Sequence, residues 1–129
     1  MIRGIGVDLV DLARFEAKLQ QTPALIERLF HPIERSYTPR QLAGSFAAKE
    51  ALVKALGSPD GLTWTELSVV RDSLGAPWLH ADGASAKRLV DAQVTKLHLS
   101  LSHDGGMLIA YLVAEGPGSL EGTEGGFDA

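Results

Sequence analysis

Three charged residues offer the most chemistry in this chain: Asp8, Glu50 and Lys54. Asp8 ends an apolar run that begins at Ile2, and Glu50 precedes Lys54 by four residues, about one helical turn. Two carboxylates without a larger cluster of Asp, Glu or His suit a hard cation such as Mg²⁺, which completes its shell with water and phosphate oxygens. The lysine could neutralise a phosphoryl oxygen or protonate a leaving oxygen. These residues predict a site for a metal ion and a phosphate-bearing ligand.

A serine and a histidine extend this prediction, but every residue in it also has an ordinary structural explanation. Ser102 and His103, at the end of a predicted strand, can donate hydrogen bonds to a second phosphate. However, a Glu–Lys pair at this spacing is common on exposed helices, an aspartate after a strand can simply cap a turn, and a histidine before a hairpin is usually just exposed. Spacing alone leaves both interpretations open.

The first strand must position Asp8. Residues 2–9 alternate, which places Gly4, Gly6 and Asp8 on one face. We expect the opposite, apolar face to pack in the core, and the glycine face to stay bare and leave room for a bulky ligand. The apolar face carries Ile5, Val7 and Leu9.

A long helix must position Glu50 and Lys54. Thr38 and Gln41 form a capping box around Pro39, and Gly57 provides a stop, so the pattern predicts a helix from there to residue 55 or 56. Shorter helices are expected after Asp11 and over 23–30 and 84–92, and strands over 65–71, 77–80, 96–103 and 107–113. The expected fold class is α+β, a compact antiparallel sheet packed with a long helix.

Composition sets the class of protein. The chain has 129 residues, 45% of them hydrophobic, and no cysteine, which excludes thiol chemistry. We expect a single domain over 1–115, a flexible tail over 116–129, a cytoplasmic location, and no membrane segment. The net charge of −4 argues against nucleic acid, but residues 1–54 hold eight basic against six acidic residues. That half could steer an acidic partner or a phosphorylated ligand.

Four separated motifs carry a family resemblance. In order, they closely resemble the holo-[acyl-carrier-protein] synthase family of 4'-phosphopantetheinyl transferases, over residues 1 to about 115. The resemblance implies transfer of the phosphopantetheine arm from coenzyme A to a serine of an apo acyl carrier protein or carrier domain, releasing adenosine 3',5'-bisphosphate. It also implies the fold of these transferases. The motifs are Gly4–Val10 with Arg14, Phe46–Gly57, Gly75–Pro77 and Leu99–His103.

The resemblance also implies roles for the residues at the predicted site. Asp8 and Glu50 match the Mg²⁺ ligands of the family, and Mn²⁺ would suit the same oxygens. Lys54 matches the lysine that contacts the phosphates and assists the leaving group, which completes the catalytic set. His103, with Ser102 beside it, matches the motif that contacts coenzyme A phosphate.

Contacts with partners follow from the same resemblance. Arg14 matches the basic residue that meets the acidic carrier protein, and Lys18, one turn further, could extend that surface. Lys49 could reach the ribose 3'-phosphate of coenzyme A or could simply be solvated. Small members of the family form homotrimers with sites at the subunit boundaries. The short polar link Glu34–Pro39 departs from the family.

Two other functions use the same residues. A metal-dependent hydrolase of nucleotide pyrophosphates would take water as the acceptor in place of a carrier serine. A non-catalytic module would bind coenzyme A or the carrier without turnover. Consumption of coenzyme A in the absence of carrier would distinguish the hydrolase from the transferase.

Overall fold

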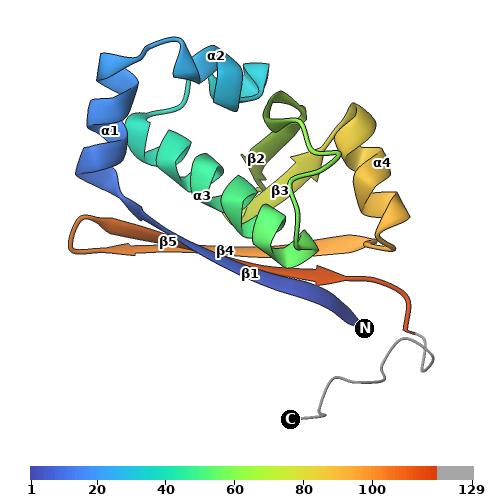
Figure 1. The fold of residues 1–129 in the computed structure, drawn as a ribbon. Coiled ribbons are helices and arrows are strands. Elements are labelled where there is room, and N and C mark those ends of the chain that lie inside the picture. Colours follow the sequence, from blue (N-terminus) through green and yellow to red (C-terminus); the bar gives the residue numbers. More distant parts are fainter. Residues whose placement is uncertain (119–129) are drawn as a thin grey trace.

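The computed structural model describes residues 1–118, and within them a long helix lies across a three-stranded antiparallel sheet (Figure 1). The predicted tail therefore lies almost entirely outside the described residues. The predicted α+β fold class is confirmed. In chain order the elements are β1 Ile2–Asp11, α1 Leu12–Gln21, α2 Leu25–Leu29, the 3₁₀ helix η1 Pro32–Glu34, α3 Pro39–Leu56, the 3₁₀ helix η2 Trp64–Glu66, β2 Leu67–Arg71, β3 Pro77–Ala81, α4 Gly83–Asp91, β4 Lys96–Asp104 and β5 Met107–Glu115.

The main sheet has the order β1-β5-β4, so the last strand of the chain lies at its centre. β5 pairs antiparallel with both neighbours, and Asp8 stands opposite Ala110. The β4–β5 hairpin turns through Gly105 and Gly106, whose φ angles of 56° and 80° favour glycine. β2 and β3 form a second, two-stranded sheet. No helix among residues 1–118 is long and apolar enough to cross a membrane.

The predicted boundaries of the long helix are confirmed. Thr38 and Gln41 make the reciprocal capping box, Pro39 occupies the first turn, and Gly57 ends the helix in a left-handed conformation with φ of 83°. The face of α3 toward the sheet is made of small side chains. Ala43, Ala47 and Ala51, which are fully buried, follow each other along this face. Small residues let the helix axis approach the strands closely.

The predicted orientation of β1 is wrong. Gly4 and Gly6 face α3 rather than open space, and a Cβ at Gly6 would lie 2.8 Å from the carbonyl carbon of Ala51 and closer still to its oxygen. The two glycines therefore form the surface against which α3 packs, and they do not leave a bare surface for a ligand. The opposite face, expected in the core, is exposed. Its side chains are Ile5 at 56%, Val7 at 44% and Leu9 at 60% exposure.

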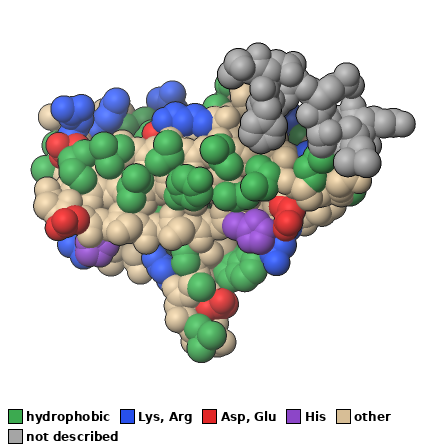
Figure 2. Space-filling model, turned by 90° about the horizontal axis from the view of Figure 1, so that it is seen from below, with side chains coloured by type: hydrophobic (Ala, Val, Ile, Leu, Met, Phe, Trp, Pro, Cys, Tyr) green, Lys and Arg blue, Asp and Glu red, His purple; other side chains and the backbone are tan. Residues whose placement is uncertain are grey.

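Figure 2 shows the face of the molecule that is turned away from α3, with hydrophobic side chains gathered in a row across the sheet. Ile109 and Tyr111 of β5 stand opposite Leu9 and Val7 of β1 and share this exposure. We call this surface, Ile5, Val7, Leu9, Ile109 and Tyr111, the apolar sheet face. A contiguous apolar surface of this kind commonly marks an interaction site.

Candidate functional site

The structure brings Asp8, Glu50 and Lys54 together where β1 and α3 run side by side. The Lys54 ammonium lies 3.2 Å from Asp8 Oδ1 and donates a hydrogen bond of 2.9 Å to the carbonyl oxygen of Val7. Glu50 reaches the same place because its neighbour Ala51 packs against Gly6, two residues before Asp8 on the same strand face. Residues 46 positions apart in the chain thus form one cluster.

The pKa of Glu50 is set by burial and by its charged neighbours in this cluster. Burial raises the pKa of Glu50 above its ordinary value, the negative charge of Asp8 raises it further, and the positive charge of Lys54 opposes the shift. The shift means that the cluster holds its second negative charge at a free-energy cost. A divalent cation would relieve this cost, so the electrostatics favour cation binding.

The donor set also limits how a cation would be held. No group of three or more His, Cys, Asp or Glu side chains suited to a metal occurs within the described part of the chain. A cation at Asp8 and Glu50 would therefore have two protein carboxylates and take its other ligands from water or a substrate. Mg²⁺ is commonly bound in this way, with substrate phosphates completing its octahedral shell.

A groove of about 350 Å³ leads away from the two carboxylates. Arg14 and Lys18, one turn apart on α1, are exposed at its rim. Its apolar wall comes from α1, α2 and α3. This wall contains Phe15, Leu19, Leu25, Leu29 and Phe46. The predicted metal ligands and the predicted partner-binding residues therefore line a single groove.

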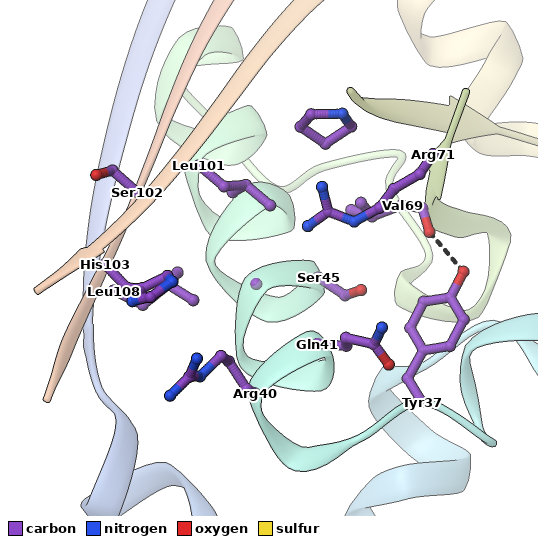
Figure 3. Close-up of a pocket in the computed structure, with 12 residues that line it drawn as sticks. Tyr37, Arg40, Gln41, Ser45, Val69, Arg71, Leu101, Ser102, His103 and Leu108 are labelled. Carbon is purple, nitrogen blue, oxygen red and sulfur yellow. Dashed lines mark hydrogen bonds between the residues drawn. The ribbon is translucent and has the colours of Figure 1, made fainter. Parts of the chain in front are cut away.

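His103 lies elsewhere, in a cavity of about 500 Å³ on the other side of α3, and Ser102 beside it points its side chain away from this cavity (Figure 3). No residue lines both this cavity and the groove. Within one chain, the structure does not bring Ser102 and His103 to Asp8 and Glu50. Figure 3 shows His103 at the end of β4, with Arg40 of α3 beside it.

Two arginines of this cavity were not recognised from the sequence. Arg40 from the first turn of α3 and Arg71 from the end of β2 make it strongly basic together with His103. Each residue also had an ordinary role, in a helix cap and at a strand end, and nothing in their spacing indicated a common cavity. Ser45, which is 1% exposed, also lines the cavity, and its hydroxyl has no hydrogen-bond partner among the described residues.

The position of Lys49 contradicts the predicted contact with a coenzyme A phosphate. Its side chain is fully buried, and its ammonium lies 2.6 Å from Glu34 Oε1. Two further hydrogen bonds go to backbone carbonyl oxygens of Leu29 and Trp64. The alternative prediction, that Lys49 is solvated, is wrong for the same reason.

Comparison with known proteins decides the family. A family model described as the 4'-phosphopantetheinyl transferase superfamily matches residues 4–112. This chain belongs to that superfamily. The predicted family resemblance is thereby confirmed.

Relatives within the transferase superfamily cover nearly the whole chain. A holo-[acyl-carrier-protein] synthase of Clavibacter sepedonicus is 53% identical over 119 residues, which make up 92% of this chain and 100% of the relative. One from Kocuria rhizophila is 52% identical, covering 89% of this chain and 94% of the relative.

Solved structures in the superfamily have the same fold. Holo-[acyl-carrier-protein] synthase from Neisseria meningitidis aligns with a TM-score of 0.82 at 31% identity, over 89% of this chain and 99% of that one. The enzyme from Helicobacter pylori, solved in complex with coenzyme A, aligns with a TM-score of 0.75 at 29% identity, over 86% of this chain and 99% of that one.

Proposed function

We propose that this protein transfers 4'-phosphopantetheine from coenzyme A to a serine of an apo acyl carrier protein or carrier domain. The products are the holo-carrier and adenosine 3',5'-bisphosphate. The observation that carries the proposal is the cluster of Asp8, Glu50 and Lys54, whose two carboxylates line one groove, in a superfamily member. The names of its relatives and the coenzyme A complex of a structural neighbour support it.

Asp8 and Glu50 are the proposed ligands of Mg²⁺, with Mn²⁺ as an alternative of similar chemistry. The raised pKa of Glu50 and the all-oxygen donor set fit such an ion. When bound, it would supply positive charge against the diphosphate of coenzyme A. By holding that positive charge in the groove, the two side chains would position the diphosphate and keep its reacting phosphorus close to the incoming serine.

Lys54 is the proposed phosphate-binding lysine. The carbonyl of Val7 and the carboxylate of Asp8 hold its ammonium at the cluster, while its side chain is 54% exposed and open to a ligand. In the reaction the serine oxygen bonds to the phosphorus that carries pantetheine, and the bond from that phosphorus to the bridging oxygen breaks. Lys54 would stabilise the negative charge that develops on the leaving phosphate. The serine proton is released to solvent.

The basic cavity is the proposed site for the adenosine phosphates. Arg40, Arg71 and His103 offer several donors to phosphate oxygens. Ser102 is not part of this donor set, because its side chain lies on the other face of β4, beside Ile109. This cavity and the groove lie on different sides of α3. One coenzyme A molecule could contact both if the groove of one subunit adjoined the cavity of the next. The apolar sheet face supplies a surface for such an assembly. We therefore propose a homotrimer with sites at the subunit boundaries.

Arg14 and Lys18 are the proposed contacts with the carrier protein. Both are exposed at the rim of the groove whose inner end holds Asp8 and Glu50. A carrier with an acidic surface would be steered there, which brings its serine toward the phosphates. Location in the cytoplasm belongs to the same proposal.

Intact-mass spectrometry of a carrier protein tests this function. Apo-carrier would be incubated with the protein, coenzyme A and Mg²⁺, and in parallel with chelator. We expect a gain of one phosphopantetheine that chelator, Asp8→Asn and Glu50→Gln each abolish. Asp91→Asn, which neutralises an exposed carboxylate on α4, is the matched control and should leave transfer unchanged. Loss of coenzyme A without any change in carrier mass would instead indicate a hydrolase.

A further inference from the structure

Lys49 is a buried cation with an unusual set of partners. It is fully buried, and its ammonium makes three short contacts: 2.6 Å to Glu34 Oε1, 2.9 Å to the carbonyl oxygen of Leu29, and 3.2 Å to that of Trp64. Burying a charge is costly, and a single carboxylate only partly offsets that cost. Two of the three contacts go to the backbone, so the ammonium does more than neutralise Glu34.

The two carbonyls belong to segments that shape the groove of the proposed active site. Leu29, the last residue of α2, lines the groove itself. Trp64, the first residue of η2, stacks on Phe46 with ring centroids 5.7 Å apart and planes inclined by 15°. Phe46 lines the groove one turn of α3 before Glu50. Through Lys49, the helix that carries Glu50 is therefore tied to both segments that support the apolar wall.

Glu34 links the Lys49 ammonium to strand β2 and to the start of η1. Its second oxygen accepts the N–H of Val69 on β2, and its first oxygen also accepts the N–H of His31. Glu34 Oε1, 2.6 Å from the ammonium, supplies the opposite charge for this buried cation. The ammonium also lies 5.0 Å from the centre of the Phe30 ring, a favourable cation–π distance. Every polar atom of the Lys49–Glu34 pair has a partner.

We infer that Lys49 is a positioning residue for the proposed transfer reaction: its ammonium fixes the Leu29 and Trp64 backbones and so sets the apolar wall of the groove beside Glu50. This inference rests on the proposed function for its effect on rate. The apolar wall is where a pantetheine arm or the carrier would rest, and small displacements of such a wall reduce the fraction of productive complexes. Loss of the contacts should therefore lower kcat more than it raises the KM for coenzyme A.

The test compares two variants that differ in the carbonyl contacts. Glu34→Gln removes the carboxylate charge but leaves Lys49 able to bind both carbonyls. Lys49→Met combined with Glu34→Gln removes the contacts without leaving an unpaired charge. Both are made with Trp78→Phe, because Trp64 is then the remaining tryptophan of the chain. Acrylamide quenching of Trp64 is measured without substrates, and transfer kinetics are measured separately.

We expect the double variant to show at least a twofold larger quenching constant for Trp64 and a kcat at least tenfold lower, with the KM for coenzyme A changed less than threefold. Glu34→Gln should change both readouts less. Circular dichroism first establishes folding. If the Lys49→Met substitution prevents folding, Lys49→Gln with Glu34→Gln replaces it, and the same two changes are expected.

Two results for the double variant would overturn the inference. One is a Trp64 quenching constant equal to that of the Trp78→Phe parent. The other is a larger quenching constant with the kcat of that parent. Failure of the proposed function looks different, because the parent protein itself would then show no transfer while the fluorescence comparison still reports on the wall.

Discussion

Gly6→Ala is the substitution that most directly tests how the site is built. An added methyl group would lie 2.8 Å from the carbonyl carbon of Ala51, closer still to its oxygen, and 3.0 Å from the nitrogen of Ala55. Distances under 3.0 Å are essentially never found for a Cβ, and the opposing atoms are backbone, so no side chain can rotate away. Either α3 must shift away from β1, or β1 must leave its register with β5.

The size of the effect follows from these contacts. Overpacking against rigid backbone should lower the free energy of unfolding by about 3 kcal/mol, the upper part of the usual range. For a domain of this size, this corresponds to a fall in Tm of roughly 10 °C. The same shift separates Glu50, next to Ala51, from Asp8. A misplacement on the order of 1 Å can reduce turnover about 100-fold.

Gly44→Ala is the matched control in the same helix. The nearest atom to its added methyl is Leu101 Cδ1 at 3.3 Å, the end of a flexible side chain. Because alanine is favoured over glycine in a helix by about 1 kcal/mol, the expected Tm is equal or higher. Thermal unfolding by circular dichroism gives the first comparison. Transfer by Gly6→Ala is then measured well below its Tm, so that only folded protein is compared.

Two results would contradict this link between the packing of α3 and the site. An unchanged Tm for Gly6→Ala would show that the strand and helix are not packed as tightly as the structure indicates. If folded Gly6→Ala has a lowered Tm but the full transfer rate, the packing of α3 against β1 does not control the distance between the carboxylates.

Three further predictions concern pH, carrier binding and assembly. The raised pKa of Glu50 means that the folded, metal-free protein binds a proton more readily than the unfolded chain, so its stability should fall as pH rises from the ordinary value of 4.5 through the raised value. Glu50→Gln should abolish this part of the pH dependence and raise the Tm in chelator at pH 8 by a few degrees; an identical Tm–pH curve would contradict the shift. Arg14→Glu should raise the KM for carrier about tenfold at low salt, with a smaller effect at high salt and on the KM for coenzyme A. The control Lys87→Glu, on α4, should leave the KM for carrier unchanged. Equal effects of Arg14→Glu on both substrates would exclude a docking role. Leu9→Glu on the apolar sheet face should convert the proposed trimer to monomers in analytical ultracentrifugation and reduce transfer; a variant that sediments like the parent protein would remove that face from the interface.

Local signals predicted the long helix well. The capping box, the proline in the first turn and the terminal glycine each act within a few residues, and the structure shows all three. The β4–β5 hairpin was equally predictable, because strict alternation and a Gly-Gly turn are local. Both features place Glu50, Lys54 and His103 on their elements without any tertiary information.

The orientation of β1 required information that alternation does not contain. Alternation identifies which residues share a face, but not which face meets the helix. Ile5, Val7 and Leu9 are apolar, which predicts a place in the core, but it is the bare backbone of Gly4 and Gly6 that lets α3 approach. The contact depends on alanines more than 40 residues later in the chain.

Long-range contacts also explain the other errors. Lys49 lies next to Glu50, and a lysine beside an active-site residue suggests a ligand contact, but its partner Glu34 is 15 residues away on a separate 3₁₀ helix. Arg40 and Arg71 line one cavity only because β2 packs near the start of α3. Such pairings are set by the packing of layers, which the spacing of residues does not reveal.

The alternation of β1 makes its length as important as its composition. Its ten residues present glycines and Asp8 to α3 on one side and the apolar sheet face on the other. Deleting one residue between Gly6 and Asp8 would exchange the two sides for the rest of the strand. A charged carboxylate would then face outward and branched side chains would face the helix backbone. In a library of insertions and deletions, we therefore expect changes of one residue within this segment to be lost, because each one exchanges the two faces of the strand.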